Sequence, residues 1–327
     1  MRISRSIPVA ADTPIALTIG NFDGVHLGHQ AMLARLRDAA VRHGVPPCVM
    51  TFEPHPREFF APDQAPTRLT SLREKLELIA AHGVEHAIVC RFNYEFAQHT
   101  AQDFIDRTLV KGLGVRWLQV GDDFRFGARR AGDFVMLKQA ALHYGFEVEA
   151  MASVTLDGER VSSTAVRNAL AAGNLGYAGR LLGRPYSISG RVVRGDGMGR
   201  KLGFPTANMQ MKHNRPPLTG IFVVELAGVA ERPLRGVASL GIRPTVKTQG
   251  PPVLEVHVFD FDGNLYGRHV RVDFLHKLRD EEKYADLATL TRQIALDVEN
   301  AKAFFNRQDS SQYPLEGYAK STKKCIK

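Results

Sequence analysis

The stretch PIALTIGNFDGVHLGHQ, residues 14–30, joins an apolar run to two histidines that flank a glycine. Residues 15–19 have the composition of a buried strand, and apolar residues recur at helical spacing after Gly28, so a strand should give way to a helix here. The imidazoles of His26 and His29 then lie at the carboxyl end of that strand. This spacing is compatible with a metal pair, a phosphate-binding turn or an ordinary surface turn.

Gly28 indicates a turn, and no third metal ligand lies nearby in the sequence. In a phosphate-binding turn, the glycine lets the backbone approach a ligand, and the start of the helix offers free N–H groups and a positive dipole end. Two imidazoles there could donate hydrogen bonds to phosphate oxygens and stabilise the charge that develops when phosphorus is attacked.

From residue 15 to about residue 183, short apolar runs alternate with amphipathic stretches of helical length. This repetition predicts βαβ units, and therefore an α/β domain with a largely parallel sheet and helices on both faces. Ligands of such sheets bind beyond the carboxyl ends of the strands, which is where the HLGH stretch lies. A second helix start, VSSTAVRNAL (161–170), has Ser162 or Ser163 as an N-cap and Arg167 one turn further, which suits another anion.

After residue 183 the pattern changes to closely spaced β-rich runs separated by Gly and Pro turns, with one long helix predicted at 285–305. This predicts an antiparallel sheet or small barrel. We therefore expect a first domain at 1–183, a second at 184–310 and a polar, basic, disordered tail at 311–327.

The composition is that of an ordinary globular protein, with 44% apolar and 24% charged residues and no apolar run of membrane-spanning length. The N-terminal residues lack the apolar core of a secretory signal, and the three scattered cysteines favour a reducing, cytoplasmic location. The net charge of +9 suits anionic ligands, although four of the positive charges lie in the tail.

Seven motifs, in order along residues 13–306, resemble the family of bacterial bifunctional riboflavin kinase/FAD synthetases. GNFDGVHLGHQ (20–30), FEPHP (52–56), VGDDFRFG (120–127) and VSSTAVR (161–167) are similar to its FMN adenylyltransferase half, an HxGH nucleotidyltransferase with a Rossmann-like fold. GRVVRGDGMGRKLGFPTAN (190–208), GVASLGIRPTV (236–246) and LEVHVFDFDGNLYG (254–267) are similar to its riboflavin kinase half.

The resemblance implies that the first half joins FMN to the α-phosphate of ATP, giving FAD and pyrophosphate. It assigns the ATP phosphates to His26 and His29 as catalytic residues, with Gly28, Ser163, Thr164 and Arg167, and places Asn21 and Asp23 beside the nucleotide. It assigns the flavin side to His55, Pro56, Asp123, Phe124 and Phe126. Without the resemblance, FEPHP is equally compatible with a rigid loop, and Phe124 with an aromatic residue of the core.

The glycine-rich stretch of the second half lacks the ending of a Walker A loop, but Gly195, Gly197 and Gly199 would let a flap lie close to phosphates. The oxygens of Thr206 and Asn208 are of the kind that Mg²⁺ accepts. Glu255 alternates with aliphatic residues in VLEVHVFDF, so it projects from the opposite face of its strand, either into solvent or into a site.

The resemblance makes Glu255 the base that activates the 5′-hydroxyl of riboflavin, and Arg279 in LRDEEKY (278–284) a flavin contact. Ser239 stands where the family commonly has asparagine, so no role is assigned to it.

Two alternatives compete with this interpretation: another HxGH adenylyltransferase, acting on nicotinamide mononucleotide or phosphopantetheine, and an RNA-binding module. Another HxGH adenylyltransferase would leave the β-rich half unexplained. An RNA-binding module usually interleaves exposed aromatic and basic residues, a pattern that this sequence does not show. We expect an enzyme that is a monomer or weak homo-oligomer, with flavins and ATP as substrates, Mg²⁺ as cofactor, and no nucleic acid or membrane partner.

Overall fold

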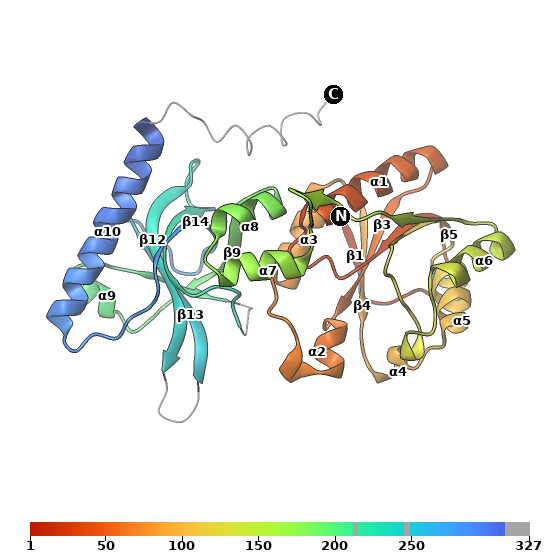
Figure 1. Ribbon diagram of the computed structural model, residues 1–327, viewed down its shortest axis with the longest axis horizontal. Helices are drawn as coiled ribbons and strands as arrows, with labels where there is room; N and C mark the ends of the chain where they lie inside the picture. The colour runs from red at the N-terminus through yellow and green to blue at the C-terminus, as the bar shows by residue number, and fades with distance from the viewer. Residues whose placement is uncertain (212–214, 245–248, 311–327) are drawn as a thin grey trace. The chain divides into compact units, whose positions relative to one another are not determined.

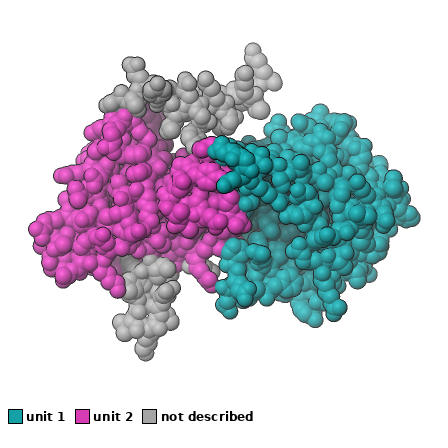
Figure 2. All heavy atoms as spheres, in the orientation of Figure 1, with its two compact units in different colours: residues 1–66, 70–163 teal, residues 67–69, 164–327 magenta. Residues whose placement is uncertain are grey.

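The computed structural model describes residues 1–211, 215–244 and 249–310. These residues form two compact units (Figure 2). Unit 1 comprises residues 1–66 and 70–163, and unit 2 comprises residues 67–69 and the chain from residue 164 onward.

Unit 1 alternates strands and helices along the chain (Figure 1). Its strands are β1 (Arg2–Ser4), β2 (Ile15–Ile19), β3 (Pro47–Glu53), β4 (His86–Arg91), β5 (Val115–Gly121), β6 (Glu147–Met151), β7 (Thr155–Leu156) and β8 (Glu159–Arg160). Its helices are α1 (Leu27–His43), α2 (Pro56–Phe60), α3 (Leu72–Ala81), α4 (Tyr94–Ala97), α5 (Ala101–Asp103) and α6 (Phe134–Tyr144). Two 3₁₀ turns (Pro62–Gln64 and Ala128–Arg130) and a π-helix (Phe104–Gly112) that continues α5 complete the unit.

The main sheet of unit 1 has the order β1-β4-β3-β2-β5-β6, and each pair of neighbouring strands in it is parallel. The chain builds outward from β2 through β3 to β4 and then returns to the other side of β2 with β5. Strand β2 is therefore the point where the strand order reverses, and a crevice for ligands opens at its carboxyl end. The HLGH sequence follows that end directly.

Strand β2 is buried on both faces, because helices cover both sides of the sheet. Ile15, Leu17 and Ile19 pack in the core that includes the π-helix and α6. Ala16 faces the other core, against α1 and α3. The continuous apolar run of this strand is thus the pattern that a doubly covered parallel sheet requires.

Unit 2 contains a closed barrel with the strand order β10-β13-β12-β11-β14-β9, in which neighbouring strands are antiparallel. The strands are β9 (Tyr186–Val193), β10 (Ala207–Gln210), β11 (Gly220–Ala227), β12 (Leu234–Pro244), β13 (Gln249–Val258) and β14 (His269–Arg279). The helices are α7 (Ser163–Ala171, which begins at the last residue of unit 1), α8 (Leu175–Leu182), α9 (Met198–Lys201) and α10 (Leu287–Ser310).

Side chains alternate between the inside and the outside of the barrel along each strand, and apolar residues lie on both sides. Leu254 and Val256 are fully buried in β13. On the outside, Val223 and Val237 pack with Ala301 and Phe305 of α10. The long C-terminal helix therefore covers one side of the barrel, where it buries an apolar stripe that would otherwise face water.

The predicted fold, an α/β domain followed by a small antiparallel barrel and a long helix, is confirmed. Residues 164–183, which the sequence assigns to the first domain, group with unit 2, and the functional boundary at 183/184 stays a prediction. The predicted disordered tail and part of the motif at 236–246 lie outside the described residues. No helix within the described ranges is long and apolar enough to cross a membrane.

Candidate active sites

The loop after β2 has an unusual backbone. Phe22, Gly24 and Val25 have φ angles of 49°, 82° and 41°, and the side chains of Phe22 and Val25 are fully buried. Positive φ is costly for a bulky or β-branched residue, and such conformations gather at functional sites, where the surrounding structure enforces them.

Hydrogen bonds from neighbouring segments hold this loop in place. Asp23 Oδ1 accepts bonds from the backbone N–H and the hydroxyl of Thr70, at 3.0 and 3.1 Å. The N–H of Gly24 donates to the same hydroxyl oxygen at 3.1 Å, and the Thr51 hydroxyl donates to the carbonyl of Asn21 at 3.2 Å. The predicted nucleotide-side residue Asp23 thus shapes the loop and does not line the cavity described below.

The two histidines are stacked, with ring centroids 3.7 Å apart and planes 21° from parallel. His26 is the N-cap of α1, and its Nδ1 accepts a hydrogen bond from the backbone N–H of His29 at 3.4 Å. Because Nδ1 is the acceptor, a neutral His26 carries its proton on Nε2. A Cβ at Gly28 would lie 3.2 Å from the His26 ring, so the glycine makes room for the stack.

His29 is held neutral. Burial lowers the pKa of its imidazole well below the usual value of 6.5, and the positive charges of His26 and Lys75 lower it further. Its Nδ1 and the Oδ1 of Asn21 are both buried without a hydrogen-bond partner in the described part of the chain. Both residues line the cavity described below, so these two atoms are available to a ligand.

The second predicted anion-binding helix start is tied to the same loop. Ser163, the first residue of α7, donates its hydroxyl hydrogen to the carbonyl oxygen of Asp23 at 2.9 Å. Thr164 and Arg167 belong to unit 2, where the Arg167 Nε donates to the carbonyl of Thr67 at 2.6 Å. Their predicted contact with the triphosphate stays a prediction.

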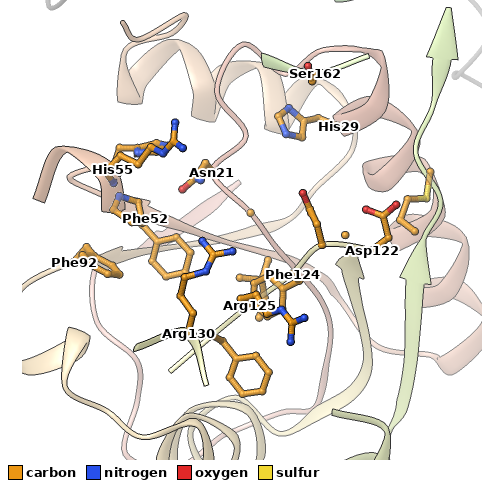
Figure 3. A pocket seen from close by; sticks show the side chains of 18 of the residues that line it. Asn21, His29, Phe52, His55, Phe92, Asp122, Phe124, Arg125, Arg130 and Ser162 are labelled. Carbon is orange, nitrogen blue, oxygen red and sulfur yellow. Dashed lines mark hydrogen bonds between the residues drawn. The ribbon is translucent and has the colours of Figure 1, made fainter. Parts of the chain in front are cut away.

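A cavity of about 970 Å³ opens at the carboxyl end of the parallel sheet (Figure 3). This volume suits a ligand of nucleotide or flavin size. Nine of the predicted site residues line it: Asn21, His26, Gly28, His29, His55, Pro56, Asp123, Phe124 and Phe126. The structure therefore brings both predicted sides of the transferase site to one cavity, from segments far apart in the sequence.

On the predicted flavin side, His55 is the N-cap of α2 and Pro56 is its first residue. The Nδ1 of His55 accepts a bond from the N–H of Arg57 at 3.1 Å. The rings of Phe124 and Phe126 stack 5.7 Å apart, and Phe126 is 6% exposed. Phe126 is thus both a core residue and part of the cavity wall.

Four phenylalanines that were not predicted as site residues, Phe52, Phe60, Phe92 and Phe96, form an aromatic wall of the cavity. The Phe92 ring meets those of Phe52, Phe60 and Phe96 edge to face, at 5.9, 5.6 and 5.8 Å. These residues come from the ends of β3 and β4 and the helices that follow, and all four line the cavity. The aromatic-rich strings FEPHPREFF and RFNYEFA, each after an apolar run, were the available signal.

The kinase motifs of the barrel also meet. Asn208 of β10 lies opposite Glu255 of β13, which lies opposite Ser239 of β12. Residues in register across neighbouring strands project from the same face. The three therefore form one row, and Glu255 alternates with the buried Leu254 and Val256 as predicted.

The glycine-rich flap packs closely on this row. A Cβ at Gly195 would lie 2.4–2.6 Å from the side-chain amide atoms of Asn208. A Cβ at Gly199 would lie 2.5 Å from the carbonyl oxygen of Phe204 and 3.2 Å from the hydroxyl of Thr206. Gly197 has a φ of 70° with open space around it, so only its backbone conformation requires glycine.

Arg279, predicted to contact flavin, pairs with a residue of α10. Its guanidinium donates two hydrogen bonds to the Asp297 carboxylate, at 2.9 and 2.7 Å, and this pairing raises its pKa. A contact with flavin stays a prediction for this residue. In the described ranges, no group of three or more His, Cys, Asp or Glu side chains could hold a metal ion.

Two family models match successive parts of the chain. The FAD synthetase family model matches residues 9–165, and the riboflavin kinase family model matches residues 182–305. The chain belongs to the family of bifunctional riboflavin kinase/FMN adenylyltransferases. It carries both enzymatic domains of that family, so it is a transferase with a kinase part and a nucleotidyltransferase part.

Individual relatives agree over nearly the whole length. The chain is 52% identical to the bifunctional riboflavin kinase/FMN adenylyltransferase of Pseudomonas fluorescens, over 88% of this chain and 91% of that protein. It is 49% identical to the protein of the same name from Escherichia coli K12, over 93% and 98%. A solved structure described as a macrolide-efflux protein from Streptococcus pneumoniae superposes with a TM-score of 0.77 at 29% identity, covering 91% of this chain and 97% of that one.

Proposed function

We propose that unit 2 phosphorylates riboflavin with ATP to give FMN, and that unit 1 joins FMN to the adenylyl group of ATP to give FAD and pyrophosphate. The observation that carries the second step is the stacked histidine pair, held on a strained loop and opening into a cavity with an aromatic wall. The wall offers apolar ring faces to a flavin, and the histidines offer ring nitrogens to a phosphate.

In the transferase step, an oxygen of the FMN phosphate attacks the α-phosphorus of ATP, and the bond from that phosphorus to the pyrophosphate oxygen breaks. No covalent enzyme intermediate is needed, so the protein positions the reactants and stabilises the developing charge. The imidazole of His29, kept neutral by burial, and that of His26 donate hydrogen bonds to phosphate oxygens. Ser163 supports the histidine loop, because its hydroxyl donates a hydrogen bond to the carbonyl oxygen of Asp23.

In the kinase step, Glu255 accepts the proton of the riboflavin 5′-hydroxyl while the oxygen of that hydroxyl attacks the γ-phosphorus of ATP. ADP leaves. The position of Glu255 beside Asn208 in the row across β10, β13 and β12 supports this role. The backbone of the flap from Gly195 to Gly199 lies close enough to this row to cover the ATP phosphates.

The donor set of the barrel fits Mg²⁺. The hydroxyl of Thr206 and the amide oxygen of Asn208 are hard ligands, and the glycines beside them leave space that a Cβ would fill. Thr206 and Asn208 would hold the ion together with ATP phosphates. Bound there, Mg²⁺ would neutralise phosphate charge.

We place both reactions in the cytoplasm, since both consume ATP, and the free, buried thiols of Cys48 and Cys90 suit a reducing compartment. Incubation of the purified chain with riboflavin and Mg-ATP, followed by chromatography, tests the proposal. FMN should form first and FAD later, with ADP and pyrophosphate as co-products, and EDTA should stop both steps. Absence of either flavin product from folded protein would refute the corresponding half.

A further inference from the structure

A short hairpin at residues 126–132 presents two adjacent arginines at the edge of the cavity. Arg129 and Arg130 both have left-handed backbones, with φ angles of 55° and 59°, and both side chains are exposed. Two consecutive arginines in this conformation are unusual, because it is disfavoured for side chains other than those of Gly, Asn and Asp. Such strain persists only where the surrounding structure enforces it.

The surroundings of the hairpin do enforce it. Phe126 and Gly132 pair across its base through two backbone hydrogen bonds of 3.2 and 2.9 Å. The N–H of Ala128 donates to the carbonyl of His99 at 2.7 Å. A Cβ at Gly127 would lie 2.5–3.0 Å from the atoms of Ala101, so the hairpin is pressed against the start of α5. The backbone that carries the two arginines is therefore fixed by the hairpin and its contacts.

Of the five arginines that line the cavity, two have acidic partners, and Arg57, Arg129 and Arg130 have none in the described part of the chain; among these three, only Arg129 and Arg130 are adjacent. Arg160 pairs with Asp122 and Asp123, at 3.3 and 3.6 Å, and Arg125 pairs with Asp133 at 3.0 Å. Neither Arg129 nor Arg130 has an ion pair with an acidic residue in the described part of the chain. Both line the cavity, and Figure 3 shows the Arg130 side chain extending into it. Two adjacent guanidinium groups without an internal counter-charge form a site for an anion.

We propose that Arg129 and Arg130 bind the phosphate of FMN and thereby make the adenylyltransferase site select FMN over riboflavin. This inference rests on the proposed function of unit 1. The hairpin and the aromatic wall line one cavity with the histidine pair, which is assigned to the ATP phosphates. The remaining anion of the reaction is the phosphate of FMN, and it is the group that riboflavin lacks.

Such selection has a chemical purpose in this chain. Riboflavin and FMN share the ring that the aromatic wall would hold, so apolar contacts alone discriminate weakly between them. When a ligand without a phosphate enters a site that is built to pair with one, the charges of the site stay unpaired, and binding is weak. The arginine pair would therefore keep unphosphorylated riboflavin, the substrate of the kinase unit, from occupying the transferase site.

The test compares Arg129→Ala, Arg130→Ala and the double variant with wild type, and with Arg116→Ala on the exposed face of β5 as the matched control. FAD formation is measured at varied FMN and varied ATP, and its reversal at varied pyrophosphate. Inhibition by lumiflavin, which has the ring but no ribityl phosphate, reports contacts with the ring. Riboflavin phosphorylation by the same samples shows that the protein is folded.

Each single variant should raise the KM for FMN about 10- to 100-fold, the scale of losing a hydrogen bond to a charged group. Four quantities should stay within about twofold of wild type: the KM for ATP, the KM for pyrophosphate, the inhibition constant of lumiflavin and the kinase activity. Arg130→Lys should bind FMN better than Arg130→Ala and so recover part of the loss. A rise in the KM for ATP or pyrophosphate would instead assign the pair to the ATP phosphates, and weaker lumiflavin inhibition would assign it to the ring. Either result, or an unchanged KM for FMN, overturns the inference. Failure of wild type to make FAD would instead refute the proposed function.

Discussion

Replacing Gly195 with alanine should selectively disable the kinase reaction. The added Cβ would lie 2.4 Å from the Asn208 side-chain nitrogen, whereas ordinary contacts begin at about 3.4 Å. The difference, 3.4 − 2.4 = 1.0 Å, is the distance by which the flap and the amide must separate. Asn208 lies in a strand paired on both sides and is 8% exposed, so the exposed flap should give way.

A displacement of about 1 Å near reacting groups costs on the order of 100-fold in rate. We therefore expect the rate of FMN formation from riboflavin and Mg-ATP to fall about 100-fold in Gly195→Ala. Adenylylation of added FMN should be unchanged, because it uses the other unit. Both rates are measured by chromatography of flavins on the same preparation.

Gly197→Ala is the matched control within the same flap. No atom lies within 4 Å of its Cβ position, so it carries only the backbone cost of a φ of 70°, on the order of 1 kcal/mol. Its kinase rate should stay well above that of Gly195→Ala. Equal rates in the two variants, or a normal rate in Gly195→Ala, would refute the assignment of the Gly195–Asn208 contact to the kinase site.

Three further predictions concern His29 and the barrel. His29→Ala should slow FAD synthesis by about 10²–10³, the scale of losing one preorganised donor, and leave the kinase rate intact. The control His43→Ala, further along α1, should change neither rate. An equal loss of FAD synthesis in the two variants would contradict the assignment of His29. The lowered pKa of His29 means that the folded state keeps this ring neutral while the unfolded chain takes up a proton below about pH 6.5, so its contribution to stability is present above that pH and lost below it. Unfolding of unit 1, followed by the fluorescence of the single tryptophan (Trp117), should therefore depend more steeply on pH between 6.5 and 5.5 in wild type than in His29→Gln, and parallel curves would exclude this titration. Burial, and then the charge of Asp273 opposite it, raises the pKa of Glu225, so this carboxyl stabilises the fold when protonated and loses that contribution as the pH rises. Glu225→Gln should therefore raise the melting temperature at pH 7.5 more than at pH 4. A larger rise at pH 4, measured by calorimetry, would disprove this prediction.

The fold could be predicted largely because its signals are local. The apolar run at 15–19 followed by HLGH places the site at a strand end, and a parallel sheet then brings the ends of other strands to the same edge. Likewise, the alternation around Glu255 shows which face of its strand the carboxylate takes. Neither inference needs to know which distant segments touch.

The parts that were missed depend on such distant contacts. The aromatic wall requires β3 and β4 to be neighbours, and the backbone that carries Arg129 and Arg130 is fixed in part by Gly127 packing against Ala101. The pairing of Arg279 with Asp297 of α10 is another distant contact that its motif does not indicate. Pairwise geometry of this kind is set by tertiary packing, and sequence spacing does not record it.

Glu255→Gln gives the most direct test of the central claim, that one chain carries two chemically independent sites. The substitution removes the base but keeps the size of the side chain. With riboflavin and Mg-ATP, the variant should form FMN at a rate about 10²–10⁴ lower than wild type, so little FAD should accumulate. With FMN and Mg-ATP, it should form FAD at the wild-type rate. Loss of both reactions in folded protein, or phosphorylation of riboflavin at the wild-type rate, would contradict the account.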